Sequence, residues 1–121
     1  QEERKLARLR DEVKAGPEDP ARLWTLALSL HDGVLNLPEA RACYVWLLEN
    51  HPDFTQVQNG TCLYRLAEIQ FAAREVRDAV KRYHELVTQH KDHPRVADQT
   101  IRKRLEEGYK ILNKMGYPKP K

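Results

Sequence analysis

The sequence predicts an all-α fold, a solenoid (α-α superhelix) of antiparallel helical hairpins with about six helices. Three observations lead to this prediction. Apolar residues recur at the i, i+3, i+4, i+7 spacing of one helix face through most of the chain. Proline and glycine lie between these periodic segments, and no sustained alternation of period two indicates a strand. One pattern of residues also occurs twice, which indicates stacked copies of a single unit.

Each predicted helix begins or ends at a recognisable signal. Asp19 suits an N-cap and Pro20 the first turn, so a helix is expected to start there. Gly60, in the first turns of the fourth helix, weakens that prediction slightly. The helices are expected over 2–15, where Gly16 and Pro17 end the first, from Pro20 to Gly33, from Pro38 to Asn50, and over about 56–73, 76–90 and 95–115. The tail 116–121 is expected to fray.

The internal copies lie about 40 residues apart. Leu23-Trp24-x-Leu26-Ala27 matches Leu63-Tyr64-x-Leu66-Ala67, and Glu39-Ala40-x-x-x-Tyr44 matches Asp78-Ala79-x-x-x-Tyr83. His51–Pro52 corresponds to His93–Pro94, so the last helix begins a third unit. The paired alanines let two antiparallel helices approach closely. The tyrosines fill the space towards the next unit, so stacked units are expected to share one core.

These motifs resemble the tetratricopeptide repeat. The resemblance implies a right-handed superhelix within one domain, 1–121. Its parts are a leading half-repeat (2–15), repeat 1 (20–52), repeat 2 (56–93), a capping or third-repeat helix (95–115) and a tail (116–121). The stretch 65–98 is similar to repeats of bacterial envelope-associated scaffold proteins of this class. The chain departs from the family pattern at Leu47 and Leu86, where a small residue is usual, and at Gly108–Tyr109, where Leu-Ala is expected.

The resemblance also implies a binding groove. In this family the first helices of the repeats line a concave groove that receives a partner peptide. Carried over position by position, the groove residues are Trp24, Leu28 and His31 in repeat 1, Tyr64, Arg65, Glu68 and Phe71 in repeat 2, and Lys103 and Lys110 in the third unit. An aromatic and apolar strip with charges beside it suits an extended or helical peptide. The same face could instead pack against neighbouring helices. Val45 and Trp46 lie off the main apolar stripe of their helix; they could form an exposed patch or the surface on which the next helix packs, and packing is favoured.

No catalytic or metal site is predicted. Cys43 has no paired histidine, and the adjacent Glu106 and Glu107 point apart on a helix. His90 and His93 form a weak metal pattern without a second pair, so a solvated connector is the favoured interpretation. We therefore expect a non-enzymatic adaptor that uses neither cofactors nor metals and binds a protein or peptide.

Two other classes of function are kept as alternatives. Three or more repeats are normally needed for a stable stack, so the chain could be a structural segment that forms homo-oligomers through its repeat ends. The net charge of +3 is too small by itself to indicate nucleic acid. Basic residues gather in the last helix, but Asp98, Glu106 and Glu107 interrupt them. Nucleic-acid binding is therefore the weakest alternative.

The compartment is left open by the sequence. No apolar run is long enough to cross a membrane, so no membrane insertion is expected. Cys43 and Cys62 fall on consecutive antiparallel helices, and two small buried thiols are favoured over a disulfide. The chain begins at Gln1 without a signal peptide, so we expect a processed form or a fragment. The cytoplasm is favoured, with a bacterial periplasm or cell envelope as the main alternative.

Overall fold

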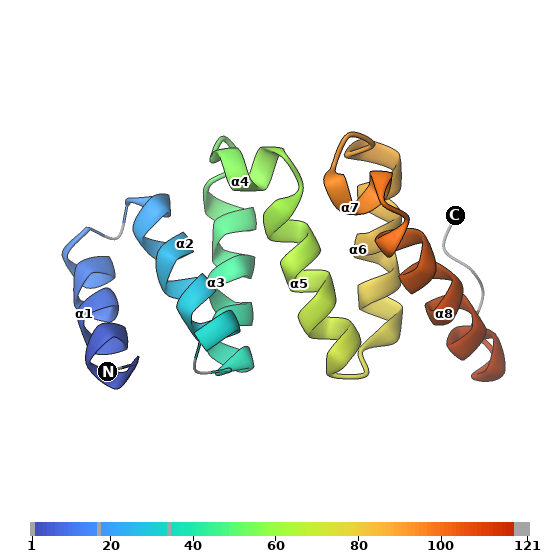
Figure 1. The fold of residues 1–121 in the computed structure, drawn as a ribbon, viewed down its shortest axis with the longest axis horizontal. Coiled ribbons are helices and arrows are strands. Elements are labelled where there is room, and N and C mark those ends of the chain that lie inside the picture. Colours follow the sequence, from blue (N-terminus) through green and yellow to red (C-terminus); the bar gives the residue numbers. More distant parts are fainter. Residues whose placement is uncertain (1, 17, 34, 118–121) are drawn as a thin grey trace. The chain divides into compact units, whose positions relative to one another are not determined.

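The computed structural model describes residues 2–16, 18–33 and 35–117, and within these ranges it contains helices and no strand (Figure 1). The all-α prediction is therefore confirmed. The described residues form eight α-helices and one short π-helix, whereas about six helices were expected. The chain divides into two compact units, unit 1 (Gln1–Val57) and unit 2 (Gln58–Lys121).

Unit 1 is a helical hairpin with one helix before it. Its elements are α1 (Glu2–Ala15), α2 (Pro20–Leu28), η1 (Ser29–Gly33) and α3 (Leu37–Asn50), and α4 (Thr55–Gln58) falls at the division between the units. Helix α2 packs against both α1 and α3. The Asp19 side chain caps α2 by accepting a hydrogen bond from the backbone N–H of Ala21. α1 ends before Pro17, which lies outside the described residues.

Unit 2 is a hairpin followed by one more long helix. Its elements are α5 (Thr61–Ala72), α6 (Val76–Gln89), α7 (Pro94–Ala97) and α8 (Thr100–Lys114). Helix α6 packs against α5 on one side and against α8 on the other. Gly108 makes the second contact close, because a Cβ at this position would lie 2.4 Å from Cγ2 of Val80. The predicted tail falls on Gly116 and Tyr117, both exposed, and on 118–121, which lie outside the described residues.

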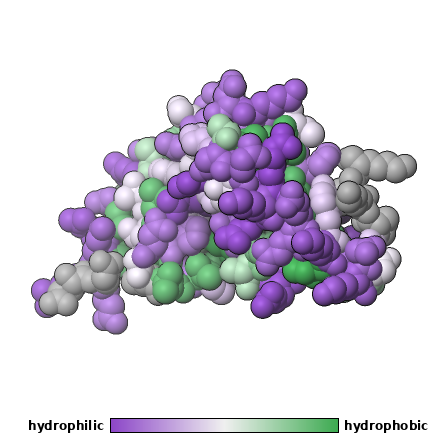
Figure 2. Space-filling view, turned by 45° about the vertical axis from the view of Figure 1, so that its right-hand side comes forward, coloured by the Kyte–Doolittle hydropathy of each residue, from purple (hydrophilic) through white to green (hydrophobic). Residues whose placement is uncertain are grey.

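The predicted core residues are buried in both units. The alanine pairs Ala27 with Ala40 and Ala67 with Ala79 have no exposed surface, and neither do Tyr44 and Tyr83. Cys43 and Cys62 are both buried and form no disulfide. Figure 2 shows a face covered mainly by hydrophilic residues, with hydrophobic residues in small patches.

Two predicted helices are each broken into a short helix and a long one. The helix expected over 56–73 is divided at Gly60, and the helix expected over 95–115 is divided at Gln99. Both residues have a left-handed backbone, with φ of 89° and 71°. Gly60 also lies against the end of α6, since a Cβ there would come within 2.9 Å of Leu86 Cδ2 and His90 Cγ. The prediction that Gly60 lies inside a helix is therefore wrong.

The connectors that contain these breaks repeat one pattern of hydrogen bonds. The N–H of His51 donates to the carbonyl of Leu47, and the N–H of His90 donates to that of Leu86, each at 2.9 Å. The next bonds also match: the N–H of Phe54 donates to the carbonyl of His51 at 3.1 Å, and the N–H of His93 donates to that of His90 at 3.0 Å. His51 therefore corresponds to His90 and Phe54 to His93, which corrects the match between the two His–Pro pairs. The same register aligns Gly108 with Ile69, instead of placing Gly108–Tyr109 at the Leu-Ala positions.

Candidate protein-binding surface

The four residues predicted on α5 lie together on one side of unit 2. Tyr64, Glu68 and Phe71 follow one another at i, i+4 and i+7 on the flank of α5 beside its buried stripe, and Arg65 is their neighbour. All four side chains are half-buried. They are therefore held by their surroundings and still reach the surface.

The carboxylate of Glu68 joins three helices. Its Oε1 accepts a hydrogen bond from the Tyr64 hydroxyl at 3.2 Å, and its Oε2 accepts one from the Tyr83 hydroxyl of α6. Arg104 of α8 donates from Nε to Oε2 at 3.1 Å and from Nη2 to Oε1 at 3.3 Å. Such a bidentate pair fixes the orientation of both side chains. We call Tyr64, Glu68, Phe71, Tyr83 and Arg104 the Glu68 cluster.

Aromatic rings complete the Glu68 cluster. The Arg104 guanidinium lies 5.3 Å from the centroid of the Phe71 ring, close enough for a cation–π interaction. The rings of Phe71 and Tyr83 meet edge to face with centroids 6.2 Å apart. Tyr83 is the buried part of the cluster and has no exposed surface. Arg104 is the part that reaches the solvent, and its side chain is 40% exposed.

Protonation states in the cluster follow from burial and from Glu68. Burial raises the pKa of the Tyr83 hydroxyl far above its ordinary value, and the hydrogen bond to Glu68 raises it further. The pKa of Tyr64 is also raised, first by burial and then by the charge of Glu68. The hydrogen bond to Glu68 raises the pKa of Arg104. At neutral pH both hydroxyls therefore remain donors, and the carboxylate is shared by three donor groups.

The groove residues predicted in repeat 1 form a second aromatic group, within unit 1. The Tyr44 hydroxyl and Nδ1 of His31 lie 2.9 Å apart and share a hydrogen bond. The Trp24 ring lies 5.7 Å from the Tyr44 ring and 6.2 Å from the Phe54 ring, measured between centroids. Leu28 is half-buried on the same helix. Two of the three predicted residues, Trp24 and His31, thus contact one buried tyrosine.

The two lysines predicted in the third unit lie outside the Glu68 cluster. Lys103 and Lys110 are exposed, and the helical spacing puts them opposite the buried stripe of α8, Ile101, Leu105 and Leu112. Arg104 enters the cluster instead, although sequence reasoning did not select it. The sequence pointed to such a residue only through Glu68, because a carboxylate among aromatic residues needs a cation beside it.

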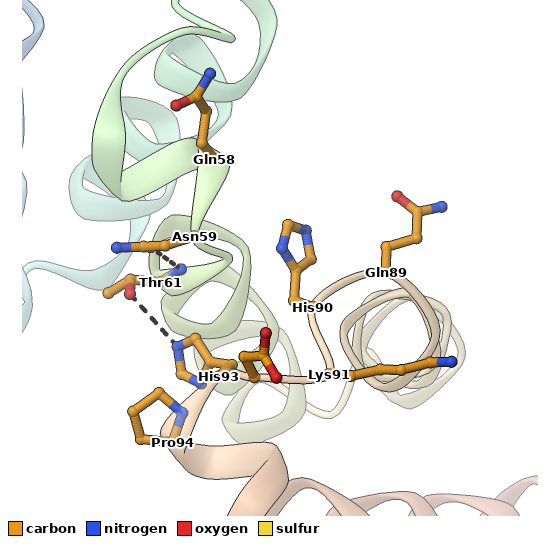
Figure 3. Close-up of a pocket in the computed structure, with 9 residues that line it drawn as sticks. Gln58, Asn59, Thr61, Gln89, His90, Lys91, His93 and Pro94 are labelled. Carbon is orange, nitrogen blue, oxygen red and sulfur yellow. Dashed lines mark hydrogen bonds between the residues drawn. The ribbon is translucent and has the colours of Figure 1, made fainter.

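A polar hollow of about 430 Å³ lies elsewhere in unit 2, between the start of α5 and the connector after α6 (Figure 3). Asn59, Thr61, His90 and His93 are among its lining residues. His93 was expected in a solvated connector, but it is only 8% exposed because its ring packs 5.6 Å from the Tyr64 ring. Among the described residues, no three His, Cys, Asp or Glu side chains are arranged to hold a metal ion.

An apolar hollow of about 300 Å³ lies in unit 1. It is lined by Val13, Leu23, Ala42, Cys43 and Trp46. Trp46 is 51% exposed, so the packing interpretation favoured for this residue is wrong. Burial raises the pKa of the Cys43 thiol to about 11, which leaves the thiol neutral at physiological pH.

Comparison with protein-family models, with curated proteins and with solved structures found no match for this chain. In the part of the chain that the structure describes, every helix is too short or too polar to cross a membrane. The geometry of the two units is therefore the main support for a functional interpretation.

Proposed function

We propose that this chain is a non-enzymatic protein-interaction module of tetratricopeptide type that acts as an adaptor or scaffold. The observation that carries the proposal is the Glu68 cluster. It holds Tyr64, Phe71 and Arg104 in fixed, half-exposed positions on one side of unit 2. Tyrosine and arginine are enriched among the residues that dominate binding energy at protein interfaces.

The network favours binding because it limits the mobility of the contact residues. A free arginine loses rotamer entropy when it is immobilised in an interface. Arg104 is already oriented by Glu68 and by the Phe71 ring, so a partner would immobilise it at a smaller cost. The hairpin and its connector recur in both units, and this repetition supports the proposed tetratricopeptide type.

A peptide array probed with the purified chain tests this proposal. Tyr64→Ala/Phe71→Ala removes both aromatic side chains from the exposed side of the cluster, and we expect the bound spots to weaken at least tenfold. The matched control is Lys81→Ala/Glu85→Ala, which changes two exposed residues of α6 outside the cluster. Circular dichroism verifies that each variant is folded. Equal binding by the folded aromatic variant and the wild type would rule out this surface.

A second candidate is a structural or self-assembling segment, and the exposed apolar residues of unit 1 favour it. Trp46 is 51% exposed and Leu35 is 68% exposed. At the matching positions, 39 residues later, unit 2 has Glu85 and Arg74. The hairpin therefore does not need apolar side chains at these sites, and a contact with another chain would account for them.

Sedimentation velocity over a wide concentration range discriminates between the two candidates. Self-association predicts a mass that rises with concentration and that returns to the monomer value in Trp46→Glu, which carries the residue of unit 2. A strict monomer over the whole range rules out self-association. Trp46→Glu is expected to leave peptide binding by the Glu68 cluster unchanged.

A further inference from the structure

The structure assigns to His93 the role of a pH-sensitive latch. Its neutral imidazole holds the connector 90–99 onto α5, and protonation of the ring releases the connector. This inference concerns the fold of unit 2 and does not depend on the proposed binding function.

Both ring nitrogens of His93 are engaged. His93 is the N-cap of α7, and its Nδ1 accepts a hydrogen bond from the backbone N–H of Arg95 at 3.1 Å. The neutral ring therefore carries its proton on Nε2, which faces Oγ1 of Thr61 on α5 at 3.4 Å (Figure 3). One tautomer of neutral histidine thus satisfies both contacts.

A protonated ring cannot keep this arrangement. An imidazolium carries a proton on both nitrogens, so Nδ1 would face the Arg95 N–H with a proton of its own. The cap of α7 is then lost. The ring is also buried against Tyr64, which makes a positive charge there costly.

The surrounding charges act mainly in the same direction. Burial is the largest cause that lowers the pKa of His93, and His90 at the end of α6 and Arg95 in α7 lower it further. Asp98, at the end of α7, opposes them. From α5 the ring packs against the ring of Tyr64, and the pKa of the Tyr64 hydroxyl is raised, so that group stays neutral. Lys91 and Asp92 line the adjacent hollow with opposite charges, and Arg104 of α8 is paired with Glu68.

The sign of the pH dependence follows from the lowered pKa. The docked ring binds a proton less readily than a ring exposed to solvent, whose pKa is about 6.5. The latch is therefore complete above about pH 6.5 and weakens as the pH falls. Between the two pKa values the released fraction rises by up to about tenfold per pH unit.

Unit 1 provides an internal control for the latch. Phe54 occupies the position that corresponds to His93, and its ring contacts Trp24 as the His93 ring contacts Tyr64. The following bonds also match, because the N–H groups of Val57 and Val96 each donate to the carbonyl three residues earlier at 2.9 Å. The connector of unit 1 therefore has the same geometry, with a ring that does not titrate at the position of His93.

Amide hydrogen exchange by NMR from pH 8 to pH 5, corrected for intrinsic exchange rates, tests the latch. We expect protection of the Val96 amide to fall on acidification by up to tenfold per pH unit, while protection of the Val57 amide stays constant. His93→Phe installs the ring of unit 1, and His93→Asn keeps a capping acceptor that does not titrate. Both variants should abolish the response at Val96, and His90→Gln should preserve it.

Three results would overturn the inference. Val96 and Val57 could lose protection in parallel in the wild type. His93→Asn could respond to pH as the wild type does, or the His93 pKa measured by NMR could be 6.5 or higher. Because His93→Asn keeps the cap, the test remains decisive if His93→Phe does not fold.

Discussion

Units 1 and 2 place buried tyrosines at matching positions and give their hydroxyl groups different partners. Tyr44 in unit 1 shares a hydrogen bond with His31, whereas Tyr83 in unit 2 donates to Glu68. The residues that correspond to Glu68 and His31 in the other unit are Leu28 and Phe71. The polar partner thus lies at the second of these two positions in unit 1, at His31 in η1, and at the first of them in unit 2, at Glu68 in α5.

This difference separates what the hairpin requires from what it leaves variable. Both tyrosines are fully buried, and a buried hydroxyl needs a hydrogen-bonding partner. Two positions of the first helix, one turn apart, can supply that partner. Only unit 2 has a carboxylate at one of these positions, and this carboxylate forms an ion pair with Arg104 of a third helix. The exposed cation–aromatic surface is therefore a consequence of Glu68.

The largest expected effect comes from Glu68→Leu, which introduces the residue of unit 1. The Tyr83 hydroxyl loses its acceptor and Arg104 loses its ion pair, so we expect the free energy of unfolding to fall by about 2–3 kcal/mol. Urea denaturation followed by circular dichroism measures the change. Adding Phe71→His supplies an acceptor as in unit 1 and should restore part of the loss. A midpoint equal to that of the wild type would contradict the comparison.

The two cysteines, one in each unit, allow a comparison of thiol reactivity, for which we expect a smaller difference. Burial raises the thiol pKa to about 11 for Cys43 and to about 12 for Cys62. At pH 8 the reactive thiolate is then about 0.1% of Cys43 and about 0.01% of Cys62. We expect both to be alkylated slowly by iodoacetamide, Cys43 about tenfold faster, as measured by peptide mass spectrometry. Faster reaction of Cys62 would show that unit 2 opens more readily than unit 1.

His31→Phe gives unit 1 the aromatic residue of unit 2 and should have a smaller effect than Glu68→Leu. The substitution removes one hydrogen bond to Tyr44 without removing a charge, and we expect a loss of about 1 kcal/mol. Thermal unfolding of the variant and the wild type measures this loss. A loss as large as that of Glu68→Leu would mean that the two tyrosines depend equally on their partners.

The smallest expected effect is that of Arg10→Ala. Arg10 pairs with Glu39 through Nε to Oε2 at 3.0 Å, but both side chains are more than a third exposed. Solvent screens such a pair, so we expect the free energy of unfolding to fall only slightly. Arg104→Ala should cost more, because Arg104 also packs on Phe71. Chemical denaturation of both variants compares the two ion pairs, and a larger effect at Arg10 would reverse this ranking.

The sequence alone determined the all-α class and the buried face of each long helix. Helical periodicity is a local property, so the i, i+3, i+4, i+7 positions predicted core residues such as Leu66, Val80 and Leu105. The hairpin alanines and the two tyrosines were also found in this way, because they recur at a fixed offset. The residues around Glu68 were selected as a group through the resemblance to the tetratricopeptide repeat, and three of them also follow one helical line.

The partners of those residues were decided only by the tertiary structure. Tyr83 and Arg104 reach Glu68 from two other helices, 15 and 36 residues away, and no local spacing indicates such a contact. The break at Gln99 was also missed, because a non-glycine residue with positive φ gives little sequence signal. Periodicity specifies which side of a helix is buried, whereas packing against distant elements decides which polar groups meet there.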